Sequence, residues 1–257
     1  MSDRRITPDP TFMTKSDEAQ IVTPIADLCR APSGPRDRQL IFGDTVVVLN
    51  DDAGWSYVQS DKDKYCGFVR SDQLDVQHVA THKITAPATH VYQRADFKSS
   101  DLNSLSFGSQ IRVTAQTKKF AETNLGFVPL PHLAEMTAYE SDPAKVAALF
   151  LGTPYLWGGN SRWGIDCSGL VQAALLACHI PCPGDSDQQQ RLGEPANGAY
   201  HRNDLLFWKG HVALVTDADT LIHANAHSMS VTYEPIHAAI KRIQDNGDGP
   251  VTAHRRL

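Results

Sequence analysis

The sequence feature that most constrains this chain is a cysteine placed where a loop turns into a helix. Asp166 is a favourable N-cap residue. Apolar residues then recur at helical spacing, at Leu170, Val171, Ala174, Leu175 and Cys178. Cys167 therefore falls in the first helical turn, where unpaired backbone N–H groups and the helix dipole favour a thiolate. This position predicts a reactive thiol with a lowered pKa, although a lone helical cysteine is more often a small buried residue.

Two histidines downstream favour the reactive interpretation. Residues 204–208 and 211–216 have the pattern of two short strands, and a third strand is expected at 221–225. The short turn between the last two predicts antiparallel neighbours, so His211 and His223 come near each other. Whether they face the same side depends on a register that the sequence does not set. A helix-start cysteine with two such histidines supplies a nucleophile, a base and a group that orients the base.

In this order the segments resemble the NlpC-type cysteine peptidases, bacterial papain-like enzymes that cut cell-wall peptides. The matching segments are Tyr155-x-Trp157-Gly-Gly, Asp166-Cys-Ser-Gly-Leu170, Asp204-Leu-Leu-Phe-Trp208 with Gly210-His-Val212, and Ile222-His-Ala-Asn225. The resemblance implies Cys167 as nucleophile, His211 as general base and His223 as the orienting residue. It also implies that Tyr155 lies beside the nucleophile and helps to hold the reacting groups.

The resemblance extends to substrate recognition. Asp185 and Ser186 match a family segment that usually carries an arginine where this chain has Gly184, so the chain keeps the Asp-Ser pair and departs from the pattern beside it. A helix N-cap is the structural alternative. Asp44 and Tyr65 match an acid and a tyrosine that similar enzymes place over the active site, where they would hold a free α-ammonium. The alternatives are a turn aspartate and a half-buried sheet tyrosine.

Other residues of the motifs also have two interpretations. Ser168 either contacts substrate or fills the first helical turn, and Trp157 either walls the cleft or only packs. Four further histidines show no partner pattern and are expected to be surface or strand residues: His201, His227, His237 and His254.

The first half of the chain repeats a β-pattern. Residues 40–48 are echoed by residues 105–113, and Gly67-Phe-Val is echoed by Gly126-Phe-Val. Short β-branched strands separated by turn residues predict a small barrel in each repeat of about 60 residues. The repeats resemble bacterial SH3-like barrels, which often accompany NlpC-type catalytic domains.

These patterns predict an α+β papain-like catalytic domain preceded by two small all-β SH3-like barrels. The expected segments are a flexible lead at 1–19, a first SH3-like barrel at 20–77, a second at 78–136 and an NlpC-type cysteine peptidase domain at 137–257. The last domain begins with Ser141-Asp142-Pro143, an N-cap and an N-terminal proline, before a helix over 144–150. Residues 251–257 are expected to return as an edge strand.

Composition excludes several partners. The 257 residues hold 24 Lys+Arg and 29 Asp+Glu, a net charge of −5, which does not suit nucleic acid or an anionic membrane. The first residues carry no apolar run of a secretion signal, and no run approaches membrane-spanning length. The five cysteines are scattered, and Cys178 and Cys182 lack the second pair of a structural zinc site. We therefore expect a cytoplasmic protein without metal or cofactor.

The resulting hypothesis is a cysteine peptidase that hydrolyses the γ-D-glutamyl–diamino acid bond of murein peptides with a free N-terminal L-Ala, in cell-wall peptide recycling. One alternative is a zinc-dependent hydrolase with Cys167, His211 and His223 as ligands, although no H-E-x-x-H helix is present. A non-catalytic cell-wall peptide-binding protein is the other, and the intact cysteine and histidines argue against it. The oligomeric state is unknown from sequence.

Overall fold

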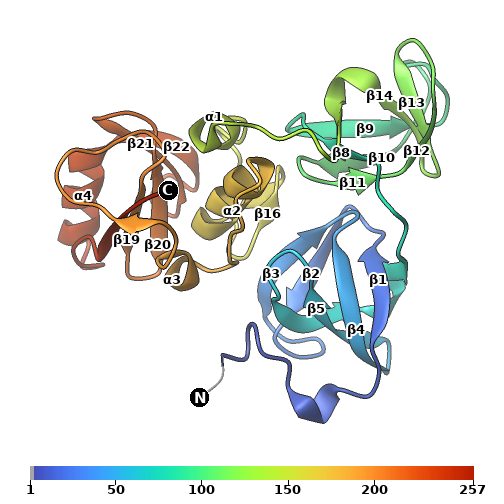
Figure 1. The fold of residues 1–257 in the computed structure, drawn as a ribbon, viewed down its shortest axis with the longest axis horizontal. Coiled ribbons are helices and arrows are strands. Elements are labelled where there is room, and N and C mark those ends of the chain that lie inside the picture. The colour runs from blue at the N-terminus through green and yellow to red at the C-terminus, as the bar shows by residue number, and fades with distance from the viewer. Residues whose placement is uncertain (1–2) are drawn as a thin grey trace. The chain divides into compact units, whose positions relative to one another are not determined.

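The computed structural model describes residues 3–257 and divides into two compact units, Met1–Ala138 and Tyr139–Leu257 (Figure 1). None of the helices within residues 3–257 is long and apolar enough to cross a membrane.

The first β-region of unit 1 is a seven-stranded antiparallel sheet in the order β3-β2-β6-β5-β4-β1-β7. Its elements are η1 (Pro10–Phe12), β1 (Asp17–Ile21), β2 (Ile25–Cys29), β3 (Arg36–Ile41), β4 (Thr45–Asp52), β5 (Trp55–Ser60), β6 (Cys66–Arg70), η2 (Ser71–Gln73) and β7 (Leu74–Val76). Alternation of apolar residues along these strands builds the core, in which Ile21, Leu28 and Val58 are fully buried.

The second β-region of unit 1 has two sheets, β10-β9-β14-β13-β12 and β11-β8-β15. Its elements are β8 (His82–Ile84), β9 (Ala88–Tyr92), β10 (Asp101–Ser106), β11 (Gln110–Ile111), β12 (Val113–Gln116), β13 (Phe120–Thr123), β14 (Gly126–Pro129), η3 (Leu130–His132) and β15 (Leu133–Glu135). Its core contains Ile84, Val91 and Leu105, and Phe42 from the first region joins it.

The sequence echo in unit 1 has a structural counterpart. Gly43 and Gly108 follow equivalent strands and have φ of 82° and 83°, values that favour glycine. In both regions the strand that contains the Gly-Phe-Val sequence leads into a 3₁₀ turn and then a short strand, β6-η2-β7 and β14-η3-β15. The two regions also touch, because the Gln110 N–H donates to the Phe42 carbonyl oxygen at 3.0 Å.

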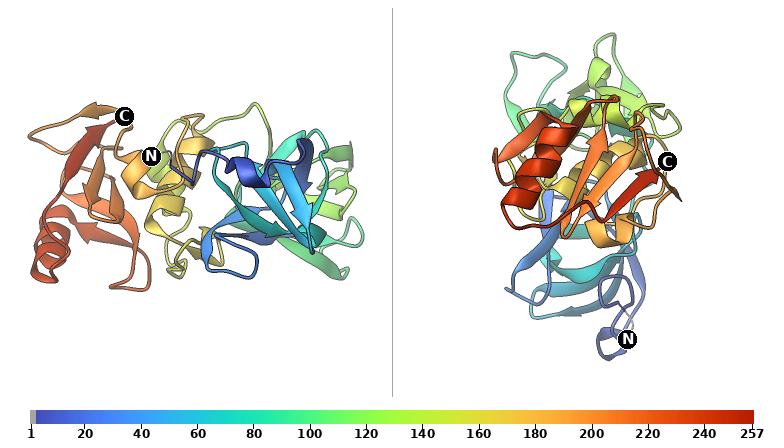
Figure 2. Two further views of the ribbon diagram at one scale, coloured as in Figure 1. Left: turned by 90° about the horizontal axis from the view of Figure 1, so that it is seen from below. Right: turned by 90° about the vertical axis from the view of Figure 1, so that its left-hand side faces the viewer.

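Unit 2 is an α+β unit built on the antiparallel sheet β18-β23-β19-β20-β21-β22. Its strands are β16 (Asn160–Ser161), β17 (Gly164–Ile165), β18 (Glu194–Pro195), β19 (Leu205–Trp208), β20 (His211–Val215), β21 (Thr220–Asn225), β22 (Ser230–Pro235) and β23 (Ala253–Arg256). Its helices are α1 (Pro143–Ala148), α2 (Cys167–Ala177), α3 (Ser186–Gln189) and α4 (Ile236–Asp245). Figures 1 and 2 show β19 to β21 lying between α2 and α4.

Most of the local predictions for unit 2 are confirmed. Helix α1 begins at Pro143 with Asp142 as its N-cap. Strands β20 and β21 are antiparallel neighbours, with Leu214 opposite Ile222. The prediction of a C-terminal edge strand is wrong, because β23 lies between β18 and β19 inside the sheet.

A buried carboxylate holds β23 in this interior position. Asp204, almost fully buried at the start of β19, accepts hydrogen bonds from His254 Nε2 at 2.6 Å and from Arg256 Nη2 at 2.8 Å. Although burial raises the pKa of Asp204, the hydrogen bonds from Arg256, the His201 N–H and His254 outweigh this and lower it to about 2. His254, for which the sequence indicated no partner, therefore helps to hold β23 next to β19 in the sheet.

This arrangement predicts an acid-sensitive contribution to stability. The pKa of Asp204 is lower in the folded than in the unfolded chain, so its stabilisation is present above pH 4 and is lost as pH falls toward 2. Asp204→Asn is expected to reduce the free energy of unfolding by about 2 kcal/mol at pH 7, and by much less near pH 2.5. Urea unfolding at both pH values measures this.

The exposed pair of Asp245 with Lys241, 2.6 Å apart on α4, provides the control. Asp245→Asn is expected to leave stability unchanged at either pH, since exposed ion pairs contribute little. Equal losses for the two variants would contradict the role given to Asp204.

Candidate active site

The site is organised by the start of helix α2. Asp166 is its N-cap, as predicted, and its Oδ1 accepts from the Gly169 N–H at 2.7 Å and from Ser168 Oγ at 3.1 Å. Its Oδ2 accepts from the Gly158 N–H at 2.9 Å. One carboxylate therefore fixes both the helix start and the preceding loop, and Cys167 is the first residue of the helix.

Close packing, more than flexibility, explains the glycines around the cysteine. A Cβ on Gly169 would lie 2.6 Å from the carbonyl oxygen of Gly159, and a Cβ on Gly159 would lie 2.5 Å from that of Gly164. Such distances are too short for any side chain. The loop therefore lies directly against the first turn of α2, which holds the backbone around Cys167 in place.

The Cys167 thiol lies against the start of strand β20. Its Sγ is 4.0 Å from the carbonyl oxygen of Gly210, and the backbone N–H of Val212 also points to it. These two residues flank His211, so the fold brings the predicted nucleophile to the predicted base. The side chain of Cys167 is nearly buried, and the whole residue is only 7% exposed.

The prediction of a lowered thiol pKa is wrong for this structure. Burial raises the pKa of Cys167 to about 12, the negative charge of Asp166 adds to this, and the backbone N–H groups of Val212 and Ser168 oppose it. The cost of desolvating the thiolate thus outweighs the stabilisation that the N–H groups at the helix start would give it. The resting group is a neutral thiol that needs a base.

The two histidines are in direct contact. Nε2 of His211 lies 2.9 Å from Nδ1 of His223. Burial lowers the pKa of His211 to about 3, with further lowering from the nearby His223 and Arg242, and burial also lowers the pKa of His223. Both rings are therefore neutral at pH 7, and one donates a hydrogen bond to the other.

This contact bears on the zinc alternative. Two nitrogen ligands of one tetrahedral zinc ion lie about 3.3 Å apart, so nitrogens 2.9 Å apart suit a shared hydrogen better than a shared metal. Within the described residues 3–257, no group of three His, Cys, Asp or Glu side chains is arranged to hold a metal ion.

Two functional neighbours were not predicted from the sequence. His223 Nε2 lies 3.1 Å from Oε2 of Glu234, and Arg242 donates from Nε to Oε1 at 2.9 Å and from Nη2 to Oε2 at 2.7 Å. In the β21–β22 register His223 is opposite Thr232, so Glu234 is its diagonal neighbour on the same face. Only the register reveals this placement.

The predicted substrate residues of unit 2 lie around α2. Tyr155 lies close to Cys167 and Asp166. Burial raises the pKa of the Tyr155 phenol, and the negative charges of these two neighbours, when ionised, raise it further. Trp157 is 68% exposed, which leaves its indole accessible from solvent. Ser168 is buried and directs its hydroxyl to Asp166, as the structural alternative required.

The segment after α2 begins helix α3. Asp185 occupies its N-cap position and Ser186 its first residue. Gln189, which the sequence did not single out, is fully buried and donates from Nε2 to the carbonyl oxygens of Ser168 at 2.9 Å and Pro183 at 3.0 Å. Gln189 thereby fastens this segment to the first turn of the cysteine helix.

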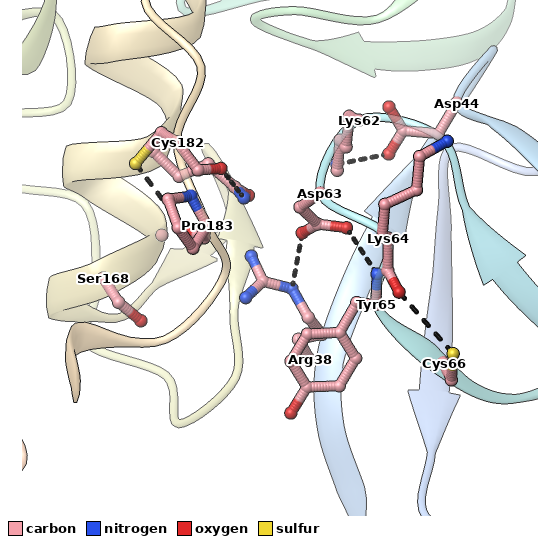
Figure 3. Close-up of polar contacts among 12 residues, drawn as sticks. Arg38, Asp44, Lys62, Asp63, Lys64, Tyr65, Cys66, Ser168, Cys182 and Pro183 are labelled. Carbon is pink, nitrogen blue, oxygen red and sulfur yellow. Dashed lines mark hydrogen bonds and ion pairs between the residues drawn. The ribbon is translucent and has the colours of Figure 1, made fainter. Parts of the chain in front are cut away.

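Asp44 and Tyr65 belong to unit 1, where both are buried among partners of that unit (Figure 3). Asp44 Oδ2 accepts from the Ile41 N–H at 2.9 Å and from Lys62 Nζ at 2.5 Å. Tyr65 is 2% exposed, so it is not the half-buried residue of the structural alternative. The guanidinium carbon of Arg38 lies 5.2 Å from the centre of its ring.

Comparison with known proteins agrees with these features. Residues 152–244 match the NlpC/P60 family, and residues 28–74 match the bacterial dipeptidyl-peptidase Sh3 domain. The chain is 26% identical to a gamma-D-glutamyl-L-lysine dipeptidyl-peptidase of Bacillus subtilis over 226 residues, 75% of this chain and 73% of the relative. It is also 26% identical to dipeptidyl-peptidase 6 of Lysinibacillus sphaericus over 215 residues, 73% of this chain and 79% of the relative.

A solved structure supports the fold. The crystal structure of an NlpC/P60 family protein from Bacillus cereus is similar with a TM-score of 0.78 at 19% identity, over 93% of this chain and 99% of the other. The sequence-based prediction of a cysteine peptidase with an SH3-like domain is confirmed. The part of the chain that contains Cys167, His211 and His223 is therefore an NlpC/P60 domain, the domain of a cysteine peptidase family.

Proposed function

We propose that this peptidase hydrolyses the γ-D-glutamyl–diamino acid bond of murein peptides, with Cys167 as nucleophile, His211 as base and His223 as the orienting residue. One observation carries the assignment of these three. The thiol lies against the two residues that flank His211, and His211 is hydrogen-bonded to His223 at 2.9 Å.

The reaction follows from the resting protonation states. Since the thiol and the imidazole are both neutral, Cys167 gives its proton to His211 as the sulfur attacks the γ-carbonyl carbon. The oxyanion meets the Cys167 N–H, which has no acceptor within the helix because it is at the first position. His211 then protonates the leaving amine, and a thioester remains. Water hydrolyses the thioester with His211 as base, which restores the thiol.

The substrate class is supported by the relatives and by the SH3 match. Two relatives are named dipeptidyl-peptidases, and one name specifies the γ-D-glutamyl-L-lysine bond. Release of a dipeptide requires a free N-terminus one residue before glutamate. We assign recognition of the L-Ala ammonium to Asp44 and Tyr65 of the matched SH3 region, together with Asp185. Asp44 would bind the substrate ammonium in addition to Lys62, which already donates a hydrogen bond to its carboxylate.

The remaining substrate contacts are assigned around α2. Tyr155 would hold the reacting groups beside the thiol, and Trp157 would form an exposed aromatic wall. Ser168 and Ser186 complete the set. Ser168 would act mainly by keeping Asp166 in place, since its hydroxyl is already bonded to that carboxylate.

The domain arrangement is part of the proposal. We assign residues 20–77 and 78–136 to two SH3-like barrels and residues 137–257 to the peptidase domain. The second barrel is supported by the repeated strand, 3₁₀ turn and strand in both regions, and by the paired glycines Gly43 and Gly108.

We further propose that the peptidase acts in the cytoplasm on wall fragments during recycling. Recognition of a free L-Ala ammonium suits small released peptides better than the intact cell wall, in which this alanine is linked to sugar. Fractionation of cells, followed by detection of the protein, tests this placement.

Substitution of the three assigned residues tests the mechanism. Cys167→Ala is expected to lower kcat for L-Ala-γ-D-Glu-diaminopimelate by about four orders of magnitude or more, because the thioester forms on the Cys167 sulfur. His211→Ala should cost a similar factor, and His223→Gln should cost less than His223→Ala. Mass spectrometry of the products measures turnover.

The control is Cys178→Ala, which alters a partly exposed cysteine just after the same helix. It should retain normal turnover, and all variants should keep their circular dichroism. Turnover by Cys167→Ala would refute the assignment, and absence of turnover in the wild type would favour a peptide-binding protein.

Zinc dependence is tested separately. Activity is expected to survive EDTA and to disappear after alkylation with iodoacetamide at alkaline pH, where the thiol with its raised pKa becomes a thiolate. The alternative of a zinc hydrolase predicts loss in EDTA and recovery on addition of zinc.

The assignment of Asp44, Tyr65 and Asp185 to the substrate ammonium predicts discrimination at the substrate N-terminus. N-acetyl-L-Ala peptides should be cleaved at least a hundredfold more slowly than free peptides. The acetyl group removes the positive charge that these carboxylates would bind, and a hundredfold corresponds to about 2.7 kcal/mol at 1.36 kcal/mol per decade. Asp44→Ala should raise KM for the free peptide and narrow this difference. Equal cleavage of both peptides by the wild type would contradict recognition of the substrate ammonium by these three residues.

A further inference from the structure

We propose that Glu234 is a positioning residue of the active site. It fixes the tautomer of His223 and, through His223, presents an unprotonated Nδ1 of His211 to the thiol. This inference rests on the proposed function, and it adds to the cysteine and two histidines a residue that touches neither substrate nor nucleophile.

Glu234 carries a negative charge. Arg242 binds both carboxylate oxygens, at 2.9 Å from Nε and 2.7 Å from Nη2. These hydrogen bonds first, and then that of His223, lower the pKa of Glu234 to about 2, against the effect of burial. An ionised carboxylate can only accept hydrogen bonds. The contact of 3.1 Å with His223 Nε2 therefore requires that this nitrogen carry the hydrogen.

The rest of the proton arrangement follows by elimination. A neutral imidazole has a single N–H, so Nδ1 of His223 has none and must accept. Its partner at 2.9 Å, Nε2 of His211, must then be the donor. This leaves Nδ1 of His211 with a free lone pair. Since Nε2 is occupied by His223, Nδ1 is the ring nitrogen that can take the proton of Cys167.

Without Glu234 the same two rings can adopt the reverse arrangement. His223 would then carry its hydrogen on Nδ1 and donate it to Nε2 of His211, which would place an N–H of His211 toward the thiol. A base with its hydrogen already in that position cannot accept another. The negative charge of Glu234 also opposes the effect of Arg242, which lowers the pKa of His211.

The fold makes this contact rigid. Glu234 lies on β22, diagonal to His223 on the neighbouring strand β21. Strand β22 runs directly into α4, and Arg242 from that helix returns to the carboxylate. The carboxylate is thus held from the strand and from the helix, so its position does not depend on solvent-exposed side chains.

The test compares Glu234→Ala and Glu234→Gln with a matched ion pair elsewhere in unit 2. Asp142 also receives two hydrogen bonds from an arginine, Arg202 Nε at 3.0 Å and Nη2 at 2.7 Å to its Oδ2, and is not part of the histidine contacts. Glu234→Ala is expected to lower kcat about 10- to 100-fold with KM within about twofold. Glu234→Gln, whose amide oxygen can still accept from His223, should lose less than about tenfold. Asp142→Ala should retain normal kcat.

The decisive readout is ¹⁵N NMR of labelled histidines at pH 7. The His211 resonances are assigned by comparison with His211→Gln. In the wild type, Nδ1 of His211 should resonate as an unprotonated nitrogen and Nε2 as a protonated one. Glu234→Ala should move Nδ1 toward the protonated range, and Glu234→Gln and Asp142→Ala should not.

The outcomes separate this inference from the proposed function. A wild type that does not cleave the peptide contradicts the function itself. A wild type that cleaves, with Glu234→Ala unchanged in kcat or with kcat lowered but the His211 resonances unmoved, overturns the role of Glu234. If Glu234→Ala fails to fold, Glu234→Leu, which also removes the acceptor of the His223 hydrogen, decides by the same two readouts, kcat and the His211 resonances.

Discussion

The hydrogen bond between His211 and His223 is the contact on which the active site depends. It requires that β20 and β21 pair in one register and that the accepting ring be neutral, and it serves the thiol because the start of β20 lies beside helix α2. Each condition has a separate physical origin: strand pairing, burial, and the loop held by Asp166. A change of register would part the two histidines, and loss of the packing between β20 and α2 would part His211 from the thiol.

Burial gives this site its chemical character. The sequence alone places Cys167 at a helix start and so favours a thiolate, but desolvation in the folded chain favours the neutral thiol. A neutral pair of thiol and imidazole avoids burial of two charges in the resting enzyme. The charges then develop only during attack, next to groups already fixed to receive them.

The sequence predicted the parts of the site that depend on local patterns. The N-cap Asp166, the helix from Cys167 and the two histidine strands were found because turn residues and periodicity are local signals. Glu234 and Arg242 were missed because their link to His223 depends on strand register and on how a helix returns to the sheet. The interior position of β23 was missed for the same reason, since it depends on the buried contacts of Asp204.

The contact between the two β-regions of unit 1 has a consequence for how such domains can be exchanged. Phe42 from the first region completes the core of the second, and a Cβ on Gly43 would lie only 2.2 Å from the carbonyl oxygen of Gln110. The first region alone would expose Phe42 to water, and the second alone would have a hole in its core. The two regions therefore form one structural unit, and transfer or deletion of either region alone is expected to destabilise the other.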